Sequence, residues 1–140
     1  MINYDFWKNK KVLITGHTGF KGSWLSIFLK SLDCEIFGLS RETIEGIYQK
    51  ANLKSIYSQE FFNDISSQNF TENFIEIKKI NPDIVFHFAA QSLVYKGYQD
   101  PLDTLNSNII GTFQVLNEIS KCSNTKSAIV STTDKVYKNS

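Results

Sequence analysis

The sequence has few of the residues that mark disulfide-rich, metal-binding or membrane proteins. Among 140 residues there are two cysteines, two histidines and two prolines. Cys34 and Cys122 lack the CxxC or Cys/His spacing of metal sites, so we interpret them as free thiols of a reducing compartment. No segment approaches the roughly 18 apolar residues of a membrane span, and the N-terminus lacks the apolar core of a signal peptide. We therefore expect a cytoplasmic protein with no metal site and no membrane association.

An excess of charge of one sign is also absent. Fifteen basic and fourteen acidic side chains give a formal net charge of +1, which provides no electrostatic footprint for nucleic acid. Hydrophobic residues make up 41% of the chain. A chain of this size buries about two-thirds of its unfolded surface, so we expect one globular domain over residues 1–140.

The first apolar run leads into a glycine-rich turn. Residues 12–14 have the pattern of a buried parallel strand, and Gly16, Gly19 and Gly22 follow at three-residue spacing. In a dinucleotide-binding unit such glycines allow the tight turn, the approach of a phosphate and close packing of the following helix. The helix N-terminus then faces the pyrophosphate. The spacing GxxGxxG is a variant of the general GxGxxG fingerprint and predicts a dinucleotide site.

Helical and strand-like segments alternate along the rest of the chain. A helix is expected from near Gly22, with one apolar face toward the sheet: Trp24, Leu25, Phe28, Leu29 and Leu32. Further strands are expected at residues 35–40, 60–65, 83–88 and 127–132. An amphipathic helix is expected at residues 69–80, and residues 43–55 have the pattern of a short helix or an irregular connection. This alternation predicts an α/β fold with a doubly wound parallel sheet of the Rossmann type.

A long helix is expected from Pro101. Its apolar residues recur on one side: Leu105, Ile109, Phe113, Leu116 and Ile119. Gly111 lies in its interior, where a glycine costs about 1 kcal/mol relative to alanine. Close packing of Gly111 on a neighbouring element would explain that cost.

Ligands of such sheets bind outside the carboxyl ends of the strands. The cofactor-binding residues are therefore expected in the glycine turn and after the second, third and fourth strands: Gly16, Thr18, Gly19, Phe20, Gly22, Ser40, Arg41, Asp64, Ile65, Ala89, Ala90 and Gln91. Small residues such as Ala89 and Ala90 let a ligand approach the backbone, although ordinary close packing explains them equally well.

The expected cofactor is NAD, with NADP as the second candidate. An acidic residue at the end of the second strand binds the ribose of NAD, whereas an arginine accommodates the 2′-phosphate of NADP. Here Ser40 and Arg41 occupy that place with Glu42 just beyond, so the choice stays open. Asp64 is placed to meet the adenine, and an Asx-type cap on the next turn is an equal alternative.

Three stretches resemble the nucleotide-sugar dehydratases of the extended short-chain dehydrogenase/reductase family. They are TGHTGFKGSWLS at 15–26, PDIVFHFAAQSLV at 82–94 and STTDKVY at 131–137, with NSNIIGT at 106–112 between them. HTGFKGSW and the Asp-Lys pair are most similar to the CDP-glucose 4,6-dehydratases. The resemblance implies that bound NAD takes hydride from sugar C4, water is lost across C5 and C6, and the hydride returns to C6. The product would be a 4-keto-6-deoxy sugar nucleotide.

The resemblance also implies catalytic roles after the fifth strand. Thr133 would hydrogen-bond the C4 oxygen, and Asp134 would act as the acid toward the leaving 6-hydroxyl. Lys135 stands where related dehydratases carry a glutamate that removes the C5 proton. A lysine serves as a base only if burial or nearby charge lowers its pKa. A solvated ion pair of Asp134 with Lys135 is the structural alternative.

One family motif is missing from the sequence. The Tyr-x-x-x-Lys pair is expected a few tens of residues after Tyr137, and the sequence ends at Ser140. Tyr4 and Lys8 have this spacing but precede the first strand, so we interpret their match as chance. The hypothesis is the N-terminal, cofactor-binding part of a sugar-nucleotide 4,6-dehydratase that lacks the later strands and the substrate lobe. Such a part would be inactive alone and would bind a sugar nucleotide only with the missing C-terminal part.

Two other functions stay open on the sequence alone. One is a dinucleotide-binding module without catalysis. The other is part of a nucleotide-sugar epimerase or reductase, although an epimerase has no need of a dehydration acid such as Asp134. In each case an unfinished sheet exposes an edge and apolar faces, so we expect self-association or marginal stability.

Overall fold

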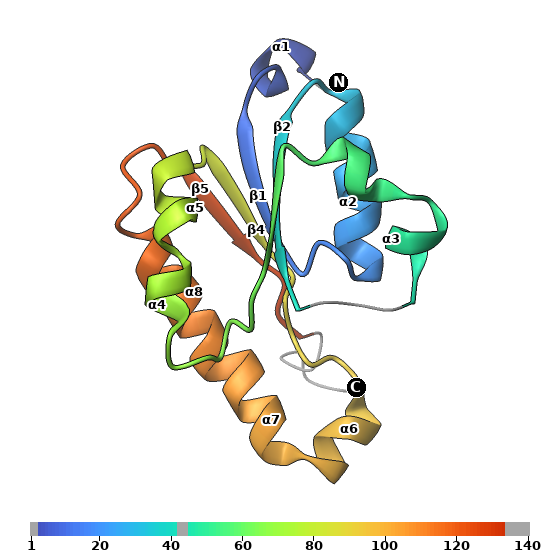
Figure 1. Cartoon of the computed structure of the whole chain (residues 1–140), viewed down its shortest axis with the longest axis vertical. Helices are drawn as coiled ribbons and strands as arrows, with labels where there is room; N and C mark the ends of the chain where they lie inside the picture. The colour runs from blue at the N-terminus through green and yellow to red at the C-terminus, as the bar shows by residue number, and fades with distance from the viewer. Residues whose placement is uncertain (1–2, 42–44, 134–140) are drawn as a thin grey trace, which may run out of the picture.

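A parallel sheet lies between two helical layers in the computed structural model, which describes residues 3–41 and 45–133 (Figure 1). The strands are β1 (Lys11–Thr15), β2 (Glu35–Ser40), β3 (Gln59–Phe62), β4 (Ile84–His87) and β5 (Ser127–Val130). Their order is β3-β2-β1-β4-β5, and every pair is parallel. The predicted Rossmann-type fold is therefore confirmed.

The central strand explains why the two layers form. Successive side chains of a strand point to opposite faces of the sheet. Leu13 faces one layer, whereas Val12 and Ile14 face the other, and all three are fully buried. Leu13 pairs with Phe37 of β2 on one side and with Val85 of β4 on the other. A strand buried on both faces has a continuous apolar run rather than an alternating one.

The helices divide between the two faces, as Figure 1 shows. One face carries α2 (Phe20–Ser31), α3 (Ile47–Lys50) and the 3₁₀ turn η1 (Leu53–Ile56), and the other carries α4 (Phe70–Asn73), α5 (Ile75–Ile80) and α8 (Thr112–Ile119). The remaining elements are α1 (Tyr4–Trp7), α6 (Val94–Gln99), α7 (Pro101–Leu105) and the π-helical segment η2 (Asn106–Gly111). In the described residues, none of the helices has the length and apolar composition of a membrane span.

The orientation predicted for the first helix is partly wrong. Leu29 and Leu32 are buried against the sheet, but Trp24 is 52% and Phe28 is 44% exposed. The buried side of α2 instead includes Ser23 and Ser26, because small side chains let the helix lie close to the glycine turn.

Two other segments differ from the expected boundaries. The helix expected at 69–80 is broken into α4 and α5, which meet at Phe74. It still buries Phe70, Phe74 and Ile77, and it ends at Asn81, which caps the helix in a left-handed conformation that asparagine tolerates. The third strand ends at Phe62, so Asp64 lies in the loop beyond it.

The long helix from Pro101 runs through α7, η2 and α8, and the apolar side noted in the sequence is mostly exposed. Leu105, Ile109 and Phe113 are 52%, 58% and 66% exposed. The side that packs on the sheet carries mainly small and polar residues beside two apolar ones: Ser107, Gly111, Val115, Glu118 and Ile119. A π segment contains an extra residue per turn, which shifts the faces of the helices on either side of it.

Candidate functional site

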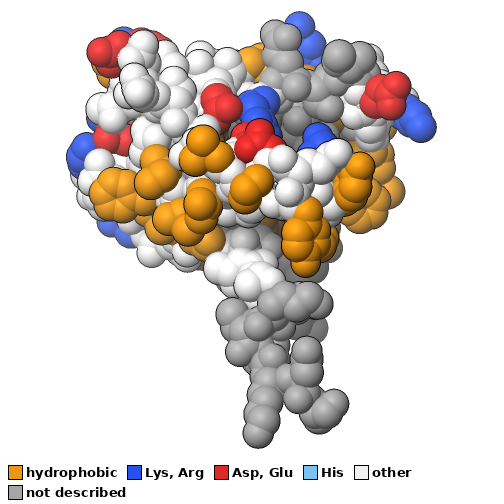
Figure 2. All heavy atoms as spheres, turned by 90° about the horizontal axis from the view of Figure 1, so that it is seen from below, with side chains coloured by type: hydrophobic (Ala, Val, Ile, Leu, Met, Phe, Trp, Pro, Cys, Tyr) orange, Lys and Arg blue, Asp and Glu red, His pale blue; other side chains and the backbone are white. Residues whose placement is uncertain are grey.

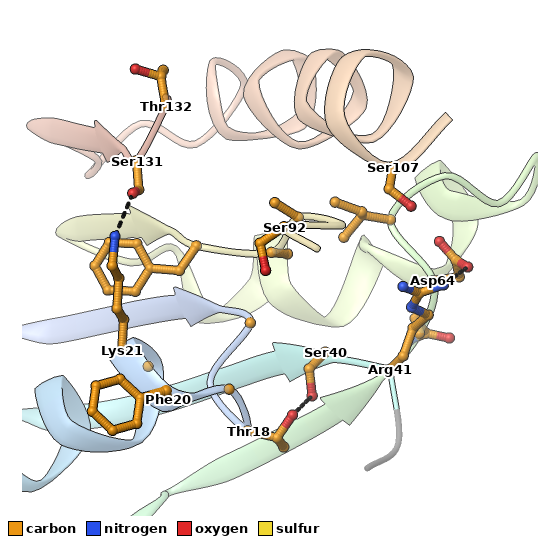
Figure 3. A pocket seen from close by; sticks show the side chains of 18 residues that line it. Thr18, Phe20, Lys21, Ser40, Arg41, Asp64, Ser92, Ser107, Ser131 and Thr132 are labelled. Atoms are coloured by element: carbon orange, nitrogen blue, oxygen red, sulfur yellow. Dashed lines mark hydrogen bonds and ion pairs between the residues drawn. The ribbon is translucent and has the colours of Figure 1, made fainter. Parts of the chain in front are cut away.

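A cavity of about 520 Å³ opens at the carboxyl ends of the strands (Figure 3). It is lined by nearly all of the residues predicted to bind a cofactor: Gly16, Thr18, Gly19, Phe20, Gly22, Ser40, Arg41, Asp64, Ile65, Ala89 and Ala90. These residues come from the glycine turn and from the loops after β2, β3 and β4, so the parallel sheet brings four distant segments together.

The glycine turn needs its glycines for steric reasons. Gly16 has φ +72°, and a Cβ there would lie 2.7 Å from the backbone nitrogen of Ala89. A Cβ on Gly22 would overlap the carbonyl oxygen of Gly16. At Gly19 the nearest atom would be 3.2 Å away, again the Gly16 oxygen, so this position is less crowded by protein. Gly16 and Gly22 are therefore packed against backbone atoms, whereas Gly19 borders the cavity with more space around it.

The N-terminus of α2 carries no capping side chain. Its cap residue is Gly19, which offers no side-chain acceptor for the N–H groups of the first turn. Lys21 lies in this turn, lines the cavity and donates a hydrogen bond to Ser131 Oγ at 3.4 Å (Figure 3). The N–H groups of the first turn, the positive end of the helix dipole and a lysine together favour an anionic ligand.

The opposite end of the cavity holds an arginine between carboxylates. Arg41 Nη1 lies 3.7 Å from Asp64 Oδ2 and 3.6 Å from Asp103 Oδ1. Asp64 Oδ1 also accepts hydrogen bonds from the Ser66 N–H and hydroxyl at 2.8 and 2.7 Å. Burial raises the pKa of Asp64, but the bonds from Ser66 and the charge of Arg41 outweigh it and hold this pKa below its usual value. Asp64 thus forms the Asx-type turn and lines the cavity as well.

Gln91 is the predicted cofactor-binding residue that does not line the cavity. Its Oε1 accepts from the Leu93 N–H at 2.6 Å, and its Nε2 donates to Thr104 Oγ1 at 2.9 Å. Asn108 of η2 bonds both the N–H and the carbonyl of Gln91, at 2.7 and 2.9 Å. The Gln91 side chain therefore fixes the loop after β4 to α7.

His17 supports the glycine turn from behind. The ring is fully buried, and its Nε2 lies 2.9 Å from Glu60 Oε1, which also accepts from the Tyr48 hydroxyl at 2.6 Å. Burial lowers the pKa of His17, and the opposing influence of Glu60 does not restore it. A Cβ on Gly38 would touch the ring, so the histidine lies directly on β2.

His87 lies at the end of β4, directly before the loop that lines the cavity. Its Nδ1 is 2.6 Å from Thr15 Oγ1, and its Nε2 is 2.9 Å from Thr112 Oγ1. Thr15 Oγ1 also accepts from the backbone N–H groups of Phe88 and Ala89. Burial lowers the pKa of His87 to about 4. The sequence signal was a polar residue inside the apolar run DIVFHF.

The predicted catalytic residues follow β5 in the sequence. Thr133 follows Ser131 and Thr132, which line the cavity, whereas Asp134 and Lys135 lie outside the described residues. Other lining residues were not predicted: Lys21, Asn63, Phe88, Ser92, Ser107, Ser131 and Thr132. In the part of the chain that is described, no group of three histidine, cysteine or acidic side chains is arranged to hold a metal ion.

Known proteins match the sequence over most of its length. Residues 13–139 match the family described as GDP-mannose 4,6-dehydratase. A CDP-glucose 4,6-dehydratase of Salmonella typhimurium is 36% identical over 99% of the chain, and a GDP-mannose 4,6-dehydratase of Vibrio cholerae is 32% identical over 79%. The chain spans 38% and 31% of the length of these two relatives.

Solved structures share the fold. A UDP-glucose 4-epimerase of Stenotrophomonas maltophila, with bound NAD and formylated UDP-arabinopyranose, has a TM-score of 0.77 at 21% identity and covers 94% of the chain. A UDP-Glc/GlcNAc 4-epimerase of Campylobacter jejuni has a TM-score of 0.73 at 27% identity and covers 90%. The chain covers 39% and 38% of these structures. Since the family match extends over almost the whole sequence, the chain belongs to the GDP-mannose 4,6-dehydratase family, among the extended short-chain dehydrogenases/reductases.

Proposed function

We propose that residues 1–140 form the NAD(P)-binding part of a nucleotide-sugar 4,6-dehydratase whose substrate is CDP-glucose. The CDP-glucose 4,6-dehydratase of Salmonella typhimurium supports this substrate, since it matches 99% of the chain. The Asp134-Lys135 pair supports it as well. The chain spans 38% of that relative, so in this proposal a sugar-binding lobe would come from sequence outside residues 1–140.

One observation carries the cofactor assignment: the glycine turn has no room for side chains behind it and borders a cavity in front. Gly16 and Gly22 are held against backbone atoms, which fixes the turn, and Gly19 leaves the N-terminus of α2 open. This is a cradle for a pyrophosphate, which needs close backbone approach and N–H donors. The residues present therefore fit a dinucleotide.

Each part of the cavity suits one part of the cofactor. Gly19 and the first turn of α2 would hold the pyrophosphate, and Asp64 with Ile65 would border the adenosine. Ala89 would leave room beside β4 for the nicotinamide. A bound dinucleotide supplies a hydride acceptor that later returns the hydride. Thr133 would hydrogen-bond the sugar oxygen from the end of β5.

Calorimetric titration of the 140-residue chain with NAD, NADP and CDP-glucose tests this function. We expect a dinucleotide to bind and CDP-glucose alone to show no binding, because the sugar lobe lies in the rest of the protein. Gly19→Ala should weaken dinucleotide binding at least about tenfold, since it inserts a methyl group where the phosphate approaches.

Gly97→Ala is the matched control, because a Cβ there meets only ordinary contacts at 3.6 Å or more. It should leave binding unchanged. Failure of the parent chain to bind either dinucleotide would contradict the proposed function. Equal binding by the Gly19→Ala variant would place the phosphate elsewhere.

A further inference from the structure

We infer that Asp103 is a specificity-determining residue: through Arg41 it makes the adenosine end of the cavity select a dinucleotide with a free 2′-hydroxyl and reject a 2′-phosphate. The inference rests on the proposed function and deepens it. The sequence alone left Arg41 open to either cofactor. What decides the matter is a carboxylate that lies 62 residues away in the chain.

The three side chains form a bridge at one end of the cavity. Arg41 follows β2, Asp64 follows β3, and Asp103 comes from α7. The same guanidinium nitrogen, Nη1, lies 3.7 Å from Asp64 Oδ2 and 3.6 Å from Asp103 Oδ1. Figure 3 shows Arg41 beside Asp64 at the side of the cavity where Ser107 of η2 lies. Arg41 is thus shared between two anionic partners.

Both carboxylates are held in place by their own neighbours. Asp64 is bonded twice by Ser66. The Asp103 backbone N–H donates to Asp100 Oδ1 at 3.0 Å, which fixes the first turn of α7, and the Ser107 hydroxyl donates to Asp103 Oδ1 at 3.5 Å. Arg41 therefore lies between anions that do not need to rearrange to hold it.

The charge balance at this end is unfavourable for a phosphate. One guanidinium and two carboxylates sum to a formal charge of −1, and the arginine that would otherwise pair with a 2′-phosphate is already engaged. Among the described residues, the other cationic side chain that lines the cavity is Lys21, which lies at the opposite end beside Ser131. A 2′-hydroxyl needs no cation and can donate a hydrogen bond to a carboxylate. The 2′-hydroxyl of NAD can therefore bond to a carboxylate here, whereas the 2′-phosphate of NADP would add negative charge beside two carboxylates.

Asp103→Asn tests the inference, because it removes one negative charge and keeps the size of the side chain. The dissociation constants of NAD and NADP are measured by calorimetry for the parent chain and the variant at one ionic strength. We expect the parent to prefer NAD by about tenfold or more, and Asp103→Asn to strengthen NADP binding by about fivefold to tenfold. The affinity for NAD should stay within about twofold.

Glu76→Gln is the matched control. It makes the same change of net charge on α5, where Glu76 pairs with Lys79 on the surface. This variant should leave the ratio of the NAD and NADP dissociation constants unchanged. Thermal unfolding of each variant separates loss of folding from a change in specificity.

Each outcome distinguishes the inference from the proposed function. Equal or tighter binding of NADP by the parent would overturn the inference and assign Arg41 to the 2′-phosphate. An unchanged ratio in Asp103→Asn would also overturn it. Absence of binding to both dinucleotides by a folded parent chain would instead contradict the proposed function itself.

Discussion

At the scale of single residues, burial keeps the His87 ring neutral, and its hydrogen bonds determine its tautomer. Thr15 Oγ1 accepts from two backbone N–H groups, so its own hydrogen is directed to His87 Nδ1. Nδ1 is then an acceptor, and the proton of the neutral ring lies on Nε2, which donates to Thr112. Protonation of Nδ1 would set two donors against each other in a buried site, which agrees with the low pKa of about 4.

This arrangement predicts a loss of stability in mild acid. In the unfolded chain His87 has a pKa of about 6.5, so between pH 6.5 and 4 the unfolded state binds a proton that the folded state does not. The free energy of unfolding should therefore fall as the pH drops from 7 to 4, by up to about 3 kcal/mol from this residue. Below pH 4 both states are protonated and the loss from His87 ends.

Urea unfolding at pH 7, 6 and 5 measures this effect. His87→Gln should show a flatter dependence than the parent, and the slope that remains should come largely from His17, whose pKa is also lowered by burial. The ¹⁵N shifts of the imidazole should report a neutral ring with the proton on Nε2 at pH 6. Titration of His87 near pH 6.5 would contradict the assignment.

Sequence patterns predicted the glycines of the turn but not the histidines around it. Gly16, Gly19 and Gly22 are recognisable because one short stretch contains the strand, the turn and the helix. His87 depends on Thr15, 72 residues away, and His17 depends on Glu60, 43 residues away. Nothing in the local sequence identifies those partners, so their roles required the folded structure.

At the scale of elements, the π segment η2 positions two walls of the cavity. Asn108 bonds the backbone of Gln91 and thereby fixes the loop after β4. Gly111 leaves room for Ile65, because a Cβ at this glycine would lie 2.6 Å from Ile65 Cγ1. π turns are rare and often lie at functional sites. Here the segment links the nicotinamide and adenosine ends of the proposed cofactor site.

Gly111→Ala should displace Ile65 and so affect both stability and binding. We expect a loss of about 1–3 kcal/mol in the free energy of unfolding from overpacking, together with weaker dinucleotide binding. Gly111→Ala combined with Ile65→Ala should lose less than the sum of the two single changes, because the smaller side chain makes room for the methyl group. Urea denaturation and calorimetry measure the two effects.

Gly97→Ala in α6 provides the comparison. A methyl group there meets Thr104 Oγ1 at an ordinary 3.6 Å, so the variant should be as stable as the parent or slightly more stable. Additive losses in the Gly111/Ile65 pair would show that the two residues do not interact. The close packing at Gly111 was predicted from the sequence, whereas the neighbour and the π geometry were not.

At the scale of the whole molecule, exposed apolar side chains gather on the helices from α6 to α8. Figure 2 shows hydrophobic side chains grouped on the face seen from below. The exposed large hydrophobic residues of this apolar helical face are Leu93, Val94, Tyr95, Tyr98, Leu102, Leu105, Ile109, Ile110, Phe113 and Leu116. The edge strand β5 is also mostly exposed, with Ile129 at 40%. Monomeric proteins rarely leave apolar surfaces of this extent uncovered.

We therefore predict that the 140-residue chain self-associates. Light scattering after size exclusion should show a mass that rises with protein concentration, and Ile109→Lys should shift the distribution toward the monomer. Ile75→Lys is the control, because Ile75 is 49% exposed on α5 and lies outside the apolar helical face. A monodisperse monomer at every concentration, or an equal effect of the control, would contradict the prediction.

The fold was more predictable than its exposed surfaces. Five apolar segments separated by helical ones sufficed to predict a parallel sheet covered on both faces, since parallel strands need long crossovers and these crossovers have one hand. Periodicity shows that an apolar face exists but not whether it meets the sheet or solvent. Trp24, Phe28 and Phe113 all belong to apolar faces of helices, and all three are exposed.

The pairing of β1 with β4 has a consequence for folding during synthesis. β1 can pair early with β2, but Thr15 meets His87 only after 72 further residues have been made. At typical translation rates of about 5–20 residues per second, this interval is roughly 4–14 s. Throughout it, one edge of β1 has no partner strand. A nascent chain is therefore most exposed to chaperones and to aggregation in this interval, and slowing synthesis before β4 would lengthen it.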